Sequence, residues 1–91
     1  MNQQILFNDQ LNVQWQQGMV EFGAQWAGQS VVCLISIEQL SKRSGQTIGN
    51  AEQAGMVFEQ LRFDLEEEAE ALIEDEAFDA QGRIWLGHAV C

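Results

Sequence analysis

The residues with the greatest potential for chemistry form an acidic run, DLEEEAEALIEDE at residues 64–76, which holds eight carboxylates and no base. Clustered carboxylates can bind a divalent cation or a basic protein, or they can be the solvated side of a helix. The run supplies −8 of the formal net charge of −10, and the other 78 residues carry six acids against four bases. The acidity is therefore local, on a chain that is otherwise nearly neutral.

Other reactive side chains are few. His88 is the only histidine, and the two cysteines, Cys33 and Cys91, lack the spacing of a metal or redox motif. The glycine-containing stretch SGQTIGN at residues 44–50 has neither the lysine nor the spacing of a phosphate loop. The acidic run lacks the spacing and the glycine turn of a calcium loop. The sequence therefore predicts no catalytic set, no metal site and no cofactor.

The three tryptophans, Trp15, Trp26 and Trp85, are the remaining candidates for a ligand site. On strands, tryptophans more often pack in a core or on a sheet surface, and we favour that interpretation. The alternative is a small-ligand binder or minor enzyme that uses these rings with His88 or Glu38. This alternative requires a concave site with convergent polar groups near the rings.

Composition restricts the class of partner. Four Lys and Arg residues and a pI of about 4.1 disfavour nucleic acids and anionic membrane surfaces, which both attract basic proteins. The N-terminal sequence MNQQILFNDQ lacks the basic and apolar regions of a signal peptide, and no segment has the length and apolarity of a membrane span. We therefore expect a cytoplasmic protein with free thiols, and Cys33 as a buried apolar side chain.

The first half of the chain has the pattern of strands. In residues 19–26, MVEFGAQW, apolar residues alternate with small or polar ones, so that Val20, Phe22, Ala24 and Trp26 share one face. The turn AGQS and the apolar run VVCLI at residues 31–35 predict that this strand continues into an antiparallel hairpin. A short third strand is expected at residues 13–15, and a final strand at residues 83–87 after a turn at residues 79–82.

Two capping signals predict two helices. Ser36 is followed three residues later by Gln39, and Asn50 is followed in the same way by Gln53, which is the arrangement of a helix N-terminus. These signals predict a short helix over residues 37–44 that stops at Gly45, and a long helix over residues 51–75.

The long helix has two different sides. At 100° per residue, its core-facing stripe contains Ala54, Val57, Phe58, Leu61, Leu65, Ala69 and Leu72. The opposite side is apolar in its first half and acidic in its second, and its members form our candidate interaction surface: Met56, Phe63, Glu66, Glu67, Glu70 and Glu74. A solvated helix face is the favoured interpretation of the carboxylates, and a docking surface for a basic partner or a cation is the alternative.

The length of this helix is informative. It would span about 37 Å, whereas a compact chain of this size has a diameter of about 31 Å. The helix must therefore overhang the domain or bend. An overhang with Met56 and Phe63 outward would favour a homodimer. Alternatively, the N-terminal segment or the short helix covers these two side chains.

The run VEFGAQWAGQSVVCLISIEQL, a long helix and the run FDAQGRIWL resemble domain of unknown function 1488, a family of small bacterial proteins. The likeness covers roughly residues 5–86 and rests on Cys33, Ile35, Ser36, Glu38 and Leu40, and on Phe78, Asp79, Gly82 and Leu86. The resemblance implies an antiparallel sheet with two helices and a returning strand, and it implies no activity.

Together these patterns predict one domain over residues 1–91, of the α+β class, with the element order β-β-β-α-α-β. We expect an antiparallel sheet with the long helix packed on one of its faces. The predicted function is a non-enzymatic protein-interaction or regulatory module. Its protein partner is unknown, and a second copy of the chain is one candidate.

Overall fold

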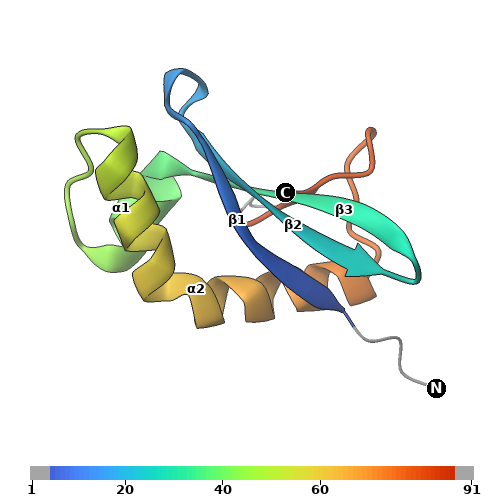
Figure 1. The fold of residues 1–91 in the computed structure, drawn as a ribbon. Helices are drawn as coiled ribbons and strands as arrows, with labels where there is room; N and C mark the ends of the chain where they lie inside the picture. The colour runs from blue at the N-terminus through green and yellow to red at the C-terminus, as the bar shows by residue number, and fades with distance from the viewer. Residues whose placement is uncertain (1–4, 88–91) are drawn as a thin grey trace.

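The computed structural model describes residues 5–87, and its element order is the predicted β-β-β-α-α-β, with one added 3-10 turn. Figure 1 shows the long strands lying over the long helix, with the short helix beside the start of the long one. The elements are β1 (Leu6–Gln14), a 3-10 turn (Trp15–Gln17), β2 (Met19–Trp26), β3 (Gln29–Ser36), α1 (Ile37–Ser44), α2 (Ala51–Glu74) and β4 (Ile84–Trp85). The fold is therefore α+β, as predicted.

The β2–β3 hairpin confirms the alternation in the sequence. Val20, Phe22 and Ala24 are buried, whereas Glu21 and Gln25 on the other face remain at least partly exposed. The strands are joined by a two-residue turn at Ala27 and Gly28, both with positive φ, and such turns match the twist of an antiparallel hairpin.

The first strand is much longer than predicted. The strand expected at residues 13–15 is present with different bounds, because β1 runs from Leu6 to Gln14 and Trp15 begins the 3-10 turn. β1 pairs antiparallel with β2, and its register shifts between Phe7 and Leu11. This bulge places three exposed polar residues in succession and breaks the alternation by which a strand is recognised in sequence.

Both helices begin where the capping signals placed them. The Ser36 hydroxyl accepts a hydrogen bond from the backbone N–H of Gln39 at 3.0 Å, and the Asn50 side chain accepts one from Gln53 at 2.8 Å. α1 ends at Gly45, which has a φ of 70°, a conformation that costs glycine little. These local contacts fix the helix starts independently of tertiary packing.

The fourth strand completes a mixed sheet of order β1-β2-β3-β4. The predicted strand at residues 83–87 is reduced to Ile84–Trp85, and it lies parallel to β3 where an antiparallel sheet was expected. The direction of β4 follows from the connection between β3 and β4. Because this connection contains two helices, it is long enough for β4 to lie beside β3 and run parallel to it. The predicted turn at residues 79–82 is confirmed, with Gly82 donating to the Asp79 carbonyl at 3.0 Å.

The core lies between the sheet and the two helices. Phe22 of β2 meets Phe58 of α2 edge to face, with ring centroids 4.9 Å apart. Of the predicted helix stripe, Ala54, Val57, Phe58, Leu65 and Ala69 are buried, Leu61 and Leu72 are half-buried, and Ile73 is an additional buried member. α2 therefore packs on one sheet face, as predicted.

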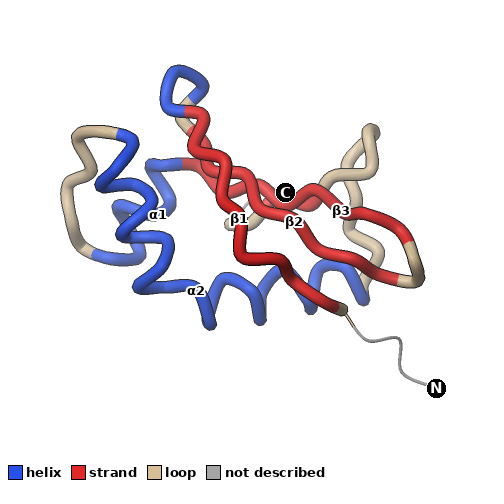
Figure 2. The backbone as a smooth tube through the Cα atoms, viewed as in Figure 1, coloured by secondary structure: helices blue, strands red, loops and turns tan. Residues whose placement is uncertain are grey.

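α2 meets its length constraint by bending. Figures 1 and 2 show that it descends beside α1, changes direction near its middle and then runs beneath the strands. A helix that curves around a core keeps its convex side toward solvent. The buried residues of both halves thus stay against one sheet, and of the two expected outcomes, an overhang or a bend, the bend is observed.

Candidate interaction surface

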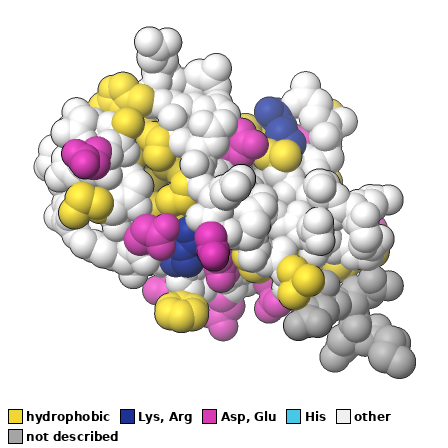
Figure 3. Space-filling model, in the orientation of Figure 1, with side chains coloured by type: hydrophobic (Ala, Val, Ile, Leu, Met, Phe, Trp, Pro, Cys, Tyr) yellow, Lys and Arg dark blue, Asp and Glu magenta, His cyan; other side chains and the backbone are white. Residues whose placement is uncertain are grey.

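The outer side of α2 carries two large apolar side chains in solvent. Met56 is 59% exposed and Phe63 is 89% exposed. Two explanations for this pair were open: self-association, or coverage by the N-terminal segment or α1. Because both side chains are exposed, the second explanation is wrong for the described residues. Figure 3 shows the hydrophobic side chains of one face as several separate groups beside acidic ones. Within the described residues, Met56 and Phe63 are the large apolar side chains that α2 leaves exposed to solvent.

Part of this surface borders a hollow of about 250 Å³ between the start of β1 and the second half of α2, which we call the acidic hollow. Its lining residues are Ile5, Phe7, Phe63, Glu66, Glu67 and Glu70. Four of the six predicted surface residues thus gather around one depression. Met56 lies outside it, and so does Glu74, which is exposed at the end of α2.

The carboxylates of the hollow differ in their partners. Glu66 accepts a hydrogen bond from Arg62 at 3.1 Å, and Arg62 also binds Glu59 at 2.7 Å. The hydrogen bond with Glu59, aided by the one with Glu66, raises the pKa of the Arg62 guanidinium. Within residues 5–87, Glu67 and Glu70 take part in no salt bridge. In the acidic hollow, Glu66 is therefore paired with a basic side chain, whereas Glu67 and Glu70 are not paired within the described residues.

One carboxylate of the acidic run has a different role, which the sequence did not reveal. Glu68 binds both Nη atoms of Arg43 in α1 and accepts the backbone N–H of Gly87 at 2.8 Å. The hydrogen bond from Arg43, together with that from Gly87, lowers the pKa of Glu68 from its usual value. We call this set the Glu68 junction. It joins α1, α2 and the segment after β4, so Glu68 is structural.

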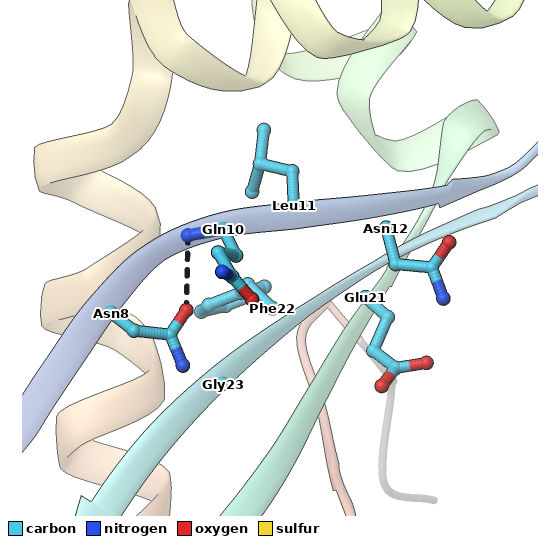
Figure 4. Close-up of a pocket in the computed structure, with 7 residues that line it drawn as sticks. All are labelled: Asn8, Gln10, Leu11, Asn12, Glu21, Phe22 and Gly23. Atoms are coloured by element: carbon cyan, nitrogen blue, oxygen red, sulfur yellow. Dashed lines mark hydrogen bonds between the residues drawn. The ribbon is translucent and has the colours of Figure 1, made fainter.

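A second, polar hollow lies at the bulge of β1. Figure 4 shows its lining, with Asn8 turned toward Gly23 and its side-chain oxygen accepting the N–H of Gln10 at 3.1 Å. The Asn8 amide nitrogen lies 2.7 Å from the point where a Cβ of Gly23 would be, so the glycine makes room for it. With a volume of about 170 Å³, this hollow is below the size of typical ligand pockets.

The tryptophans do not converge on a site. Trp26 stacks on Phe78 with centroids 6.0 Å apart, and the Trp85 indole N–H donates to Asp79 at 2.9 Å. Trp15 lies in the 3-10 turn after β1 and lines an open hollow of about 340 Å³ with Asn12, Gln14, Gln16 and Gln17. Two of the three rings therefore have structural partners, in agreement with the favoured interpretation of these residues as packing.

The surroundings of Cys33 and Asp79 shift the pKa values of both side chains. Cys33 is fully buried, and this burial raises the pKa of its thiol to about 12, which leaves too little thiolate for a nucleophile. Asp79 accepts hydrogen bonds from the backbone of Arg83 and from Trp85, Gln81 and the Arg83 side chain, which hold its pKa well below its usual range. His88 and Cys91 lie outside the described residues.

Glu38, the acidic candidate of the small-ligand alternative, is exposed in the first turn of α1 and lines none of these hollows. Among residues 5–87, no three His, Cys, Asp or Glu side chains gather as a metal site would require. No helix in this part of the chain combines the length and the apolarity needed to cross a membrane.

The fold defines a small α+β domain with a four-stranded mixed sheet and a long, bent helix. The chain belongs to the family described as protein of unknown function (DUF1488), whose family model matches residues 5–86. The expected resemblance is therefore confirmed.

Known relatives extend over nearly the whole chain. The chain is 42% identical over 87 residues to the uncharacterized protein YrdB of Escherichia coli (strain K12), covering 94% of this chain and 99% of that protein. It is 41% identical to the protein of the same name in Shigella flexneri. A crystal structure of a family member of unknown function from Shewanella loihica PV-4 superimposes with a TM-score of 0.89 at 46% identity, covering 94% of each chain.

Proposed function

We propose that the protein is a non-enzymatic protein-interaction or regulatory module. Its contact area is the α2 outer surface, defined as Met56, Phe63, Glu66, Glu67, Glu70 and Glu74. The 89% exposure of Phe63 carries this proposal. Burying such a side chain contributes about 1.5–3 kcal/mol, and aromatic anchors of this kind supply much of the affinity of protein interfaces.

The surface fits two kinds of protein partner. Met56 and Phe63 are seven residues apart on one side of α2, so a second copy of the chain with its α2 antiparallel could pack Met56 against Phe63 of the other copy. The carboxylates at the other end favour a different protein that carries basic side chains. A nucleic acid or an anionic membrane fits poorly, because the chain carries a net charge of −10.

The alternative, a small-ligand binder or minor enzyme, is less well supported. It needs tryptophans that line a cleft with convergent polar groups, whereas Trp26 and Trp85 are occupied by Phe78 and Asp79. A cytoplasmic location completes the proposal, since a free thiol at Cys33 fits a reducing compartment.

The first experiment measures solution mass by light scattering across a concentration series. The wild type is compared with Met56→Glu/Phe63→Glu and with a control, Gln16→Glu/Gln17→Glu, which adds the same charge at the exposed 3-10 turn. A wild-type dimer that becomes a monomer only in the first variant places the interface on α2. Circular dichroism verifies that both variants remain folded.

A second experiment addresses a partner other than the chain itself. A photo-crosslinking amino acid replaces Phe63 in one variant and Gln17 in another, and adducts formed in living cells are identified by mass spectrometry. We expect a defined protein adduct at position 63 that is absent at position 17 and that Met56→Glu weakens. A wild-type monomer combined with equal labelling at the two positions would contradict the proposed function.

A further inference from the structure

The two edges of the sheet differ in what they offer to another chain. β1 lies at one edge over nine residues and pairs only with β2, whereas β4 at the other edge has two residues. An edge strand exposes backbone N–H and C=O groups that can pair with an added strand. The long edge of β1 is therefore the one that an extended peptide can use.

The bulge restricts where such pairing can occur. Between Phe7 and Leu11 the register shifts, and the N–H of Gln10 is satisfied by the Asn8 side chain at 3.1 Å (Figure 4). Regular pairing is thus blocked in the middle of β1. Two stretches of β1 keep a regular register, Leu6 and Phe7 before the bulge and residues 11–14 after it. Of these, the first borders the acidic hollow, which Ile5 and Phe7 line.

We propose that the protein binds an extended basic segment of another protein, which pairs with the start of β1 at Leu6 and Phe7 and lies over the acidic hollow. This inference rests on the proposed function and specifies its partner. An apolar side chain of the segment packs beside Phe7 and Phe63, and its Lys or Arg side chains approach Glu67 and Glu70. Strand addition supplies backbone hydrogen bonds, and the hollow supplies the selectivity.

Side chains on one face of a strand repeat about every 6.6 Å. Alternate residues of the added segment therefore face the hollow. The expected sequence pattern is an apolar residue with basic residues two and four positions away.

The charge of the acidic hollow favours a basic segment over a second copy of the chain as its occupant. Two copies meeting at the hollow would bring their Glu67 and Glu70 side chains together. Within residues 5–87 the only basic side chain outside a salt bridge is Lys42, in the last turn of α1. A second copy therefore offers little positive charge to this site, whereas a basic segment neutralises it.

The test selects binders from a display library of short random peptides against the wild-type protein. We expect enrichment of peptides with Lys or Arg at alternate positions around an apolar residue. The affinity of a selected peptide should fall about fivefold to tenfold in Glu67→Gln/Glu70→Gln and about tenfold in Phe63→Ala. The control Glu38→Gln/Glu52→Gln removes the same charge elsewhere and should bind as the wild type does.

A second measurement tests the strand itself. Methylation of alternate backbone nitrogens of the selected peptide should abolish binding, and the amide signals of Leu6 and Phe7 should shift in heteronuclear NMR spectra when the unmodified peptide is added. No enrichment, acidic binders, binders insensitive to the Glu67 and Glu70 changes, or unaffected β1 amides would each overturn the inference. The proposed function would survive these results if the crosslink at position 63 is still formed.

Discussion

Two groups of carboxylates in the same helix have opposite surroundings. At the Glu68 junction, the Glu68 carboxylate receives three donors, from Arg43 and Gly87. In the acidic hollow, Glu67 and Glu70 have no salt bridge within residues 5–87, although Glu67 is adjacent to Glu68 in sequence. The comparison shows that position around the helix, and not membership of the acidic run, separates a structural carboxylate from one that is free to bind.

The largest change in the free energy of unfolding is expected when Glu68, the carboxylate at the centre of the Glu68 junction, is removed. Glu68→Ala leaves Arg43 and the N–H of Gly87 without their acceptor and should lower the free energy of unfolding by about 2 kcal/mol. The matched change Glu67→Ala, one residue away, should alter it by less than about 0.5 kcal/mol. Urea denaturation of both variants provides the measurement, and equal losses would remove the distinction between the two groups.

A substitution at Gly87, whose backbone N–H donates to Glu68, tests the Glu68 junction in a second way. Gly87 has a φ of 69°, and a Cβ there would lie 2.6 Å from Oε1 of Gln39 and 2.9 Å from Nη2 of Arg43. Gly87→Ala should therefore cost about 1–2 kcal/mol. The control Gly82→Ala has a similar φ of 80° with open space around it, so it measures the backbone strain alone. A loss in Gly87→Ala no greater than that in Gly82→Ala would show that the junction tolerates the added methyl group.

The pH dependence of stability should also identify the junction. Because the folded-state pKa of Glu68 lies below its ordinary value of 4.5, its stabilisation is complete above that value and is lost as pH falls through the folded pKa. Glu68→Gln should be less stable than wild type by about 1 kcal/mol near neutral pH. This difference should narrow as the pH falls below 4.5 in urea titrations, and a constant difference would show that the charge of Glu68 contributes nothing.

The smallest change in stability is expected for substitutions in the acidic hollow. This change is a gain, whereas the changes at the Glu68 junction are losses. Glu67→Gln/Glu70→Gln removes repulsion among Glu66, Glu70 and Glu74, so thermal stability should rise by a few tenths of a kcal/mol. The gain should shrink in high salt, which screens exposed charges. Calorimetry with and without salt measures this change. A loss of stability would mean that these acids have structural partners, as Glu68 does.

Local signals in the sequence were sufficient for some elements. The predicted helices at residues 37–44 and 51–75 are observed as Ile37–Ser44 and Ala51–Glu74, because their starts depend on caps within three residues. The outward positions of Met56 and Phe63 followed from helical geometry and are confirmed by their exposure.

Long-range contacts account for what the sequence did not show. β1 was recognised only in part, since its bulge breaks the alternation and its length depends on pairing with β2. The hollow required the start of β1 to lie beside the second half of α2, an arrangement that depends on the packing of the sheet on the helix. Glu68 was grouped with its solvated neighbours, because its partner Arg43 lies 25 positions earlier in the chain.

The parallel pairing of β4 with β3 also constrains how the domain is made. Ile84 lies beside Cys33, and the N–H of Leu86 donates to the Leu34 carbonyl at 2.8 Å, so this pairing joins positions about fifty residues apart. During synthesis the β2–β3 hairpin and both helices can form first, but this edge of the sheet stays open until residues 84–86 have been made. The open edge of β3 is then the part of the folding chain most exposed to pairing with other chains.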